Sequence, residues 1–113
     1  MTEQITIFGL KNCDTCRKAL KLIDNAGIEG ALVDVREVPL PDDLLDQALA
    51  QFSGALLNTR STTWRGLDDA ARAGAPRDLL RAYPALMKRP LIRDGQGALF
   101  LGWTAQTQAA LGI

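Results

Sequence analysis

The stretch "QITIFGLKNCDTCRKAL" (residues 4–20) decides the fold, because a strand, a loop and a helix follow one another in it. Residues 4–8 alternate and are rich in β-branched and aromatic side chains, which predicts a strand. From Asp14 onward, small or apolar residues recur at helical spacing, and Gly27 fits the position just past a helix C-terminus. "ALVDV" (31–35) predicts a second strand, so the opening third forms a βαβ unit with parallel strands.

The middle of the chain is predicted to be helical, and its end to return to strands. Helices are expected at 42–52, from Asp68 onward, and at 76–83. "PLIR" (90–93) and "ALFL" (98–101) flank the turn signal "DGQG" and predict a hairpin, followed by a closing helix over 104–111. We therefore predict a single α/β domain over residues 1–113, a small mixed sheet with helices on it and a helical insertion over 40–88.

Composition and charge bound the classes of function. Hydrophobic residues make up 47% and charged residues 23%, as in ordinary globular domains, and the formal net charge is zero. Neutrality gives no reason to expect nucleic acid or an anionic membrane as partner, and no apolar run approaches the ~18 residues that span a bilayer. The start, "MTEQITIFGL", lacks the features of a secretory signal. We expect a cytoplasmic monomer with neither nucleic acid nor membrane as a partner.

Cys13 and Cys16 form a CxxC where the loop gives way to the first helix. Cys13 falls at the N-cap or first turn, where unpaired N–H groups and the positive helix end favour an anion. Lys11, Arg17 and Lys18 add positive charge nearby, and such surroundings lower the pKa of a thiol. Cys16 lies on the apolar stripe and is expected to point inward. An outward thiol with an inward partner one turn on can form and then resolve a mixed disulfide.

The chain contains no histidine, which limits the chemistry open to the two cysteines. Cys–His dyads, Ser–His–Asp triads and the commonest zinc ligand are all excluded. Zinc normally takes four ligands, so we expect no metal site, unless two chains share one. Two inert thiols are the remaining alternative, but the strand–loop–helix context favours redox chemistry.

Bases outnumber acids between residues 58 and 93, although the whole chain is neutral. Solvated helix faces account for most arginines of this kind. The loops "NTRSTTWR" (58–65) and "KRP" (88–90) are where we expect an arginine to meet an anionic substrate beside Cys13. Guanidinium groups bind carboxylates and oxyanions in bidentate geometry, which suits that role.

Taken together, "ITIFGLKNCDTCRKAL", "ALLNTR" with "TTWR", "KRPLI" and "LFLGW" resemble the glutaredoxin-like arsenate reductase family (the ArsC/Spx family), closest to its small YffB-like branch. The resemblance covers nearly the whole chain in order. It implies a thioredoxin-like (glutaredoxin-like) fold, a four-stranded mixed sheet with a helical insertion between the second and third strands. It also implies that Arg89-Pro90 starts the third strand, with Pro90 after a cis peptide bond.

Specific residues carry over from the family's motifs. Cys13 matches the nucleophilic cysteine, and Arg89 matches the arginine beside the oxyanion. Asn58 stands where the arsenate reductases carry an arginine, with Arg60 two residues on, and Gly102 stands where they carry another. The resemblance therefore implies that Cys13 is the nucleophile. Of the family's three arginines for an oxyanion, only one, Arg89, has a match in this chain.

The residue at Cys16 bears on the choice of substrate. Arsenate reductases of this type usually have serine there, and Spx regulators have cysteine, which favours disulfide chemistry over arsenate transfer. The family implies a thiol–disulfide oxidoreductase with no bound cofactor, using glutathione as co-substrate and acting on glutathione or a protein disulfide. Two alternatives stay open: true arsenate reduction coupled to glutathione or glutaredoxin, and a redox-sensing regulator that binds RNA polymerase. The candidate catalytic residues are Cys13 and Cys16, and the candidate substrate-binding residues are Lys11, Asn58, Arg60, Arg89 and Pro90.

Overall fold

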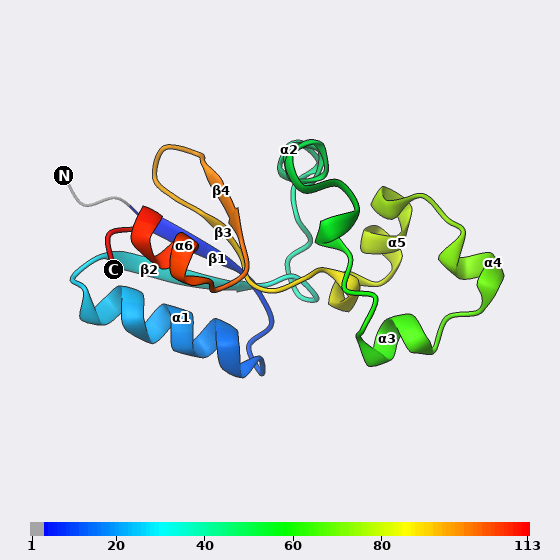
Figure 1. Ribbon diagram of the computed structural model, residues 1–113, viewed down its shortest axis with the longest axis horizontal. Coiled ribbons are helices and arrows are strands. Elements are labelled where there is room, and N and C mark those ends of the chain that lie inside the picture. The colour runs from blue at the N-terminus through cyan, green and yellow to red at the C-terminus, as the bar shows by residue number, and fades with distance from the viewer. Residues whose placement is uncertain (1–3) are drawn as a thin grey trace.

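The computed structural model describes residues 4–113 as an elongated molecule of 47 × 26 × 25 Å. Its strands are β1 (Gln4–Gly9), β2 (Glu29–Asp34), β3 (Leu91–Arg93) and β4 (Leu99–Leu101). Its α-helices are α1 (Asp14–Asn25), α2 (Asp42–Phe52), α3 (Thr62–Arg65), α4 (Asp69–Arg72), α5 (Pro76–Ala82) and α6 (Ala105–Ala110), with 3-10 turns η1 (Ser53–Leu56) and η2 (Pro84–Leu86). Figure 1 shows the sheet with α1 and α6 at one end of the molecule and α2 to α5 at the other.

The four strands form one mixed sheet in the order β2-β1-β3-β4. β1 and β2 are parallel, whereas β3 is antiparallel to both β1 and β4. All the helices of the middle segment lie between β2 and β3 in the chain. The predicted fold class is therefore confirmed, including the helical insertion between the second and third strands.

The side chains of β1 point alternately to the two faces of the sheet and contribute to two apolar cores, one on each face. Ile5 and Ile7 are buried with Cys16 and other residues of α1, while Phe8 is buried with residues of the insertion. Side chains of successive strand residues point to opposite faces, so one short strand can hold both layers. The sheet thus fixes α1 and the insertion relative to each other.

The helix α2 is fastened to β4, which is an edge strand. Nε2 of Gln47 donates to the carbonyl of Gly97 at 3.1 Å, and Nε2 of Gln51 donates to the carbonyl of Leu99 at 3.0 Å. Gln51 uses a carbonyl that the edge strand β4 otherwise leaves open, and Gln47 uses one in the turn before it, so both side chains attach the insertion to the sheet.

Two elements differ from the sequence-based expectation. β2 begins at Glu29 rather than at residue 31, because Glu29 and Gly30 continue the pairing with β1 opposite Gln4 and Ile5. The helix α3 was not predicted. It is a single turn whose N-cap, Ser61, accepts a hydrogen bond from the backbone N–H of Trp64 at 3.1 Å.

The cis peptide bond expected at Arg89-Pro90 is confirmed. It directly precedes β3, as the resemblance implied. Among residues 4–113, no helix is long and apolar enough to cross a membrane.

Candidate active site

The two cysteines lie at the start of α1, whose N-terminal end faces the insertion helices (Figure 1). Cys13 is the N-cap: its N–H donates to the carbonyl of Leu10 at 3.1 Å, and its carbonyl accepts from the N–H of Arg17 at 3.0 Å. Cys13 is partly buried and contacts both apolar cores, whereas Cys16 has no exposed surface. The helix therefore gives the thiols two different environments.

The pKa of the Cys13 thiol is lowered from its ordinary value. Burial opposes this by disfavouring the charged form, but it is outweighed by hydrogen bonding with the backbone N–H and thiol of Cys16, the charge of Arg89 and the N–H of Thr15. These groups all favour the thiolate. Since the thiolate is the nucleophilic form, Cys13 is the activated sulfur of the pair.

Cys16 has the opposite character. Burial raises the pKa of its thiol to about 11, and its hydrogen bond and charge interaction with Cys13 act in the same direction. At neutral pH Cys16 therefore keeps its proton and can donate it in a hydrogen bond to the sulfur of Cys13. One thiol stabilises the other.

The cis proline segment borders the cysteine pair. β1 and β3 pair Phe8 with Leu91, so in the same register the next residues, Gly9 and Pro90, adjoin. Pro90 is fully buried, and its carbonyl accepts a 2.8 Å hydrogen bond from the N–H of Gly102. Gly102 has a φ of 85°, a left-handed conformation that favours glycine. This turn fixes the segment that carries Arg89.

The positive charge of Arg89 favours the thiolate form of both cysteines and contributes to the lowered pKa of Cys13, although burial outweighs it at Cys16. Its side chain is partly exposed and reaches back to donate through Nη1 to the carbonyl of Ala85 at 3.2 Å. The guanidinium is thus held beside the site by one hydrogen bond and keeps other N–H groups for a ligand. The predicted proximity of an arginine to Cys13 holds for Arg89.

The loop that carries Asn58 lies beside the segment leading to Arg89. The N–H of Asn58 donates to the carbonyl of Leu86, and the N–H of Lys88 donates to the carbonyl of Leu56, both at 2.7 Å. An isolated bridge between residues 57 and 87 completes this antiparallel pairing. The two loops predicted from the sequence to carry binding arginines, 58–65 and 88–90, are therefore neighbours in space. No periodic pattern in the sequence predicts the bridge that joins them.

The other candidate binding residues make local contacts. Oδ1 of Asn58 accepts the N–H of Arg60 at 3.1 Å, so Asn58 shapes its own loop, and the side chain of Arg60 is exposed. The ammonium of Lys11 pairs with Glu37 at 2.8 Å, and Arg17 pairs with Asp14 at 2.8 Å. Any contact of these residues with a substrate stays a prediction.

Asp34 and Arg36, which are not among the residues predicted from the sequence, hold the loop before Cys13. Oδ2 of Asp34 accepts the backbone N–H of Lys11 at 3.0 Å and Nη2 of Arg36 at 2.9 Å. The available signal was the single acid in the apolar strand "ALVDV", since a buried carboxylate needs a partner. Its partner Lys11 is 23 residues earlier, so the pairing itself was not readable.

A pocket of about 210 Å³ lies between the loop after β2 and the segment from α5 to η2. Its walls include Val35, Leu40, Leu80 and Met87, with Arg36 and Arg81 at its edge, and neither cysteine lines it. The candidate active site is thus at the surface rather than in this pocket. Within the described part of the chain, no group of three or more Cys, Asp or Glu side chains could hold a metal ion, and the absence of a metal stays a prediction.

The architecture and the paired thiols are those of a thioredoxin-like protein. The ArsC family matches residues 8–110, and the chain therefore belongs to the ArsC family. An uncharacterized protein of Haemophilus influenzae is 42% identical over 101 residues, covering 84% of this chain and 89% of that protein. Both the fold and the family are related to thiol-dependent reductases.

Two solved structures support the same relationship. The YFFB (PA3664) protein has a TM-score of 0.80 and 28% identity, covering 95% of this chain and 97% of its own. An arsenate reductase (ArsC) related protein from Brucella melitensis has a TM-score of 0.69 and 34% identity, covering 100% of this chain and 97% of its own. The YffB-like branch suggested by the sequence motifs is thereby supported.

Proposed function

We propose that this chain is a cytoplasmic thiol–disulfide oxidoreductase that uses glutathione, with Cys13 as its nucleophile. The observation that carries the proposal is the unequal pair of thiols. Cys13 is accessible and has a lowered pKa, while the buried Cys16 keeps its proton and supports the Cys13 thiolate. Such a pair suits attack on a disulfide at neutral pH.

In the first step the Cys13 thiolate attacks one sulfur of a disulfide, for which a mixed disulfide of glutathione and another thiol serves as the example. A new S–S bond forms between Cys13 and the glutathione sulfur as the old S–S bond breaks. The other thiol leaves as a thiolate and takes a proton from water. The substrate thiol is reduced, and Cys13 is oxidised to the mixed disulfide.

In the second step a further glutathione thiolate attacks the glutathione sulfur of that mixed disulfide. Oxidised glutathione leaves, and the Cys13 thiolate returns to the stabilised state described above. Resolution by Cys16 is the less favoured route, because burial, the largest cause of the raised pKa of its thiol, also disfavours the Cys16 thiolate in the mixed disulfide. We therefore propose Cys16 chiefly as hydrogen-bond donor to Cys13.

Arg89 is the residue proposed to receive the anionic groups of glutathione or the departing thiolate. Its guanidinium is close enough to lower the pKa of Cys13 and keeps N–H groups beyond the one given to Ala85. Arg60, exposed on the neighbouring loop, is the second candidate for a carboxylate of the substrate.

Reduction of a glutathionylated peptide, coupled to NADPH oxidation through glutathione reductase, tests this function. The wild type is expected to turn over with dependence on glutathione, and Cys13→Ser is expected to lose the activity. Cys16→Ser is the matched variant, because it changes the second cysteine by the same substitution. The proposal fails if Cys13→Ser turns over as fast as the wild type.

Arsenate reduction is the second candidate, because a relative at 34% identity is named as arsenate reductase related. Cys13 would then attack arsenate, and glutathione or glutaredoxin would complete the cycle. Asn58 and Gly102 stand where arginines would hold the oxyanion, so disulfide exchange is favoured. Arsenate-dependent glutathione oxidation no faster than with heat-inactivated protein would remove this candidate.

A further inference from the structure

The last residue of β2, Asp34, is a buried carboxylate with 3% of its surface exposed. Oδ2 accepts the backbone N–H of Lys11 at 3.0 Å and Nη2 of Arg36 at 2.9 Å. Oδ1 accepts the backbone N–H of Arg36 at 2.9 Å and its Nε at 3.2 Å. Both oxygens are therefore used, and one of the bonds goes to the backbone two residues before Cys13.

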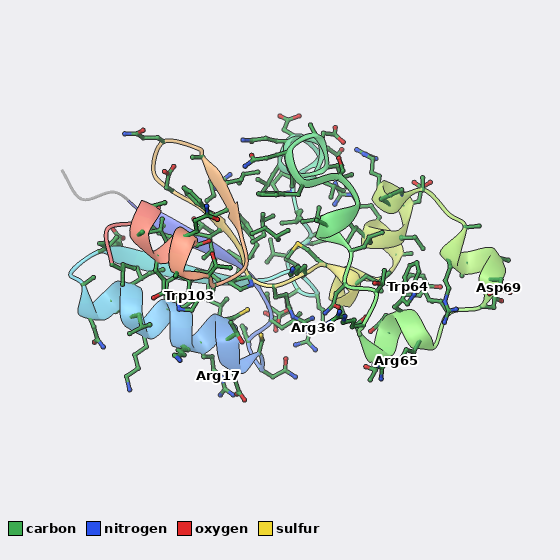
Figure 2. The ribbon with its side chains drawn as sticks, in the orientation of Figure 1. Arg17, Arg36, Trp64, Arg65, Asp69 and Trp103 are labelled. Carbon is green, nitrogen blue, oxygen red and sulfur yellow. The ribbon has the colours of Figure 1, made fainter. Side chains whose placement is uncertain are left out.

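Neighbours of Asp34 hold the same loop. Nη2 of Arg36 also donates to Oδ1 of Asn12 at 3.3 Å, and the ammonium of Lys11 pairs with Glu37 at 2.8 Å. Figure 2 shows Arg36 between the sheet and the insertion, at the level of the start of α1. Residues 34–37 thus attach directly to residues 11 and 12.

The loop of residues 10–12 needs this support, because it lies outside both the strand and the helix. Leu10 is buried in the apolar core and fixes the start of the loop, but the side chains of Lys11 and Asn12, which lie between Leu10 and Cys13, are exposed. The position of the Cys13 sulfur over the first N–H groups of α1 depends on the course of this loop. Hydrogen bonds weaken steeply with poor angles, so a small displacement of Cys13 would weaken the stabilisation of its thiolate.

We propose that Asp34 is a positioning residue that holds the backbone of Lys11, so that the Cys13 sulfur stays over the start of α1 and within the field of Arg89. The inference rests on the proposed role of Cys13 as nucleophile. Asp34 is buried and touches no substrate; it acts through the loop. Arg36 is its partner, because the guanidinium fork binds both carboxylate oxygens and Asn12 at once.

The hydrogen bonds that Asp34 accepts from Lys11 and Arg36 persist over the pH range in which a thiol titrates. The side-chain hydrogen bond from Arg36, with further ones from the backbone N–H groups of Lys11 and Arg36, outweighs burial and holds the pKa of Asp34 well below its usual range. The charged groups around the loop are Lys11 with Glu37 and Asp34 with Arg36, and Arg89 acts on the thiol from the segment before β3. The carboxylate therefore stays ionised whenever Cys13 is assayed.

A positioning role and a direct electrostatic role of Asp34 predict opposite changes in the pKa of Cys13 for Asp34→Asn. A nearby negative charge raises the pKa of a thiol, so a purely electrostatic role would let this substitution lower the pKa of Cys13. A positioning role predicts a rise, because the amide offers one acceptor oxygen and turns N–H donors toward Arg36. The sign of the shift separates the two.

The experiment measures the rate of iodoacetamide alkylation of Cys13 against pH in the full chain, with the modified peptide identified by mass spectrometry. Asp34→Asn is expected to raise the pKa of Cys13 by about one unit, which slows alkylation about tenfold below both pKa values and leaves the high-pH plateau unchanged. Arg36→Lys keeps the charge but loses the fork, and a smaller rise is expected. Asp42→Asn, which breaks ion pairs with Arg77 and Arg81 in the insertion, is the control and leaves the pKa unchanged.

An unchanged or lowered pKa in folded Asp34→Asn overturns the proposal. If Asp34→Asn does not fold, the pKa of Cys13 in Arg36→Lys tests the proposal instead. Arg36 is half exposed, so we expect this variant to fold. Alkylation reports on the thiol alone. If the wild type lacks glutathione-linked activity while Asp34→Asn still shifts the pKa, the proposed function fails and the positioning role stands.

Discussion

Gly9 lies against the sulfur of Cys16 so closely that a Cβ atom on Gly9 would overlap Sγ. The two residues belong to adjacent elements, the end of β1 and the first turn of α1. The missing side chain at residue 9 is therefore what allows Cys16 to lie fully buried behind Cys13. This contact links the packing of the sheet to the electrostatics of the site.

Gly9→Ala is expected to force Cys16 to shift and to destabilise the fold by about 1–3 kcal/mol, the usual cost of overpacking a core. Urea unfolding measures the free energy. Gly54→Ala is the matched control, because a Cβ there meets nothing within 4 Å and no positive φ is required. Equal stability of the two variants would contradict the proposed contact between Gly9 and Cys16.

Cys16 makes stability depend on alkaline pH. Burial raises the pKa of its thiol from the ordinary value to about 11, so the folded state holds this proton more tightly than the unfolded chain. The resulting stability is fully present below the ordinary pKa of a thiol and is lost as pH rises through about 11. Urea unfolding at pH 9 and pH 11 should show a larger loss in the wild type than in Cys16→Ala. Parallel losses would show that Cys16 is not buried as a protonated thiol.

Asp34 makes the stability of the fold depend on pH in the opposite direction, at acid pH. Its pKa is depressed on folding, first by the hydrogen bond from Arg36, so its contribution is present above the unfolded value near 4 and is lost as pH falls below it. Unfolding followed by circular dichroism between pH 5 and pH 2 should therefore show a steeper loss of stability in the wild type than in Asp34→Asn. A variant with the same steepness would argue against an ionised, buried Asp34.

Arg89→Ala is expected to raise the pKa of Cys13, because a positive charge that favours the thiolate is removed. Alkylation at pH 6 would slow by roughly threefold to tenfold, and Arg89→Lys would slow it less because the charge remains. Arg65→Ala, at an exposed arginine of α3 (Figure 2), is the control. Identical rates for Arg89→Ala and Arg65→Ala would remove Arg89 from the site.

The sequence predicts those features that depend on residues near one another in the chain. The hairpin around "DGQG", the stripe that buries Cys16, and Asp68 and Thr104 at helix starts are all local patterns, and the structure contains each of them. The cis bond at Pro90 came from the family resemblance. Local chemistry and the family motifs together were enough for the fold.

The sequence does not predict features that depend on distant partners. Asp34 holds Lys11 across 23 residues, and the bridge between residues 57 and 87 joins two loops without a repeating pattern. The early start of β2 has the same origin, since Glu29 and Gly30 join the strand only because β1 lies beside them. Lys11 illustrates the consequence for the site: its charge was expected near Cys13, but its ammonium pairs with Glu37.

The pH dependence of Cys13 alkylation in the wild type tests the central claim most directly. The account predicts a pKa clearly below the ~8.5 of an unperturbed thiol, with the second cysteine unreactive over the same pH range. A Cys13 pKa at or above ~8.5 would contradict the claim that the start of α1, Cys16 and Arg89 activate this sulfur.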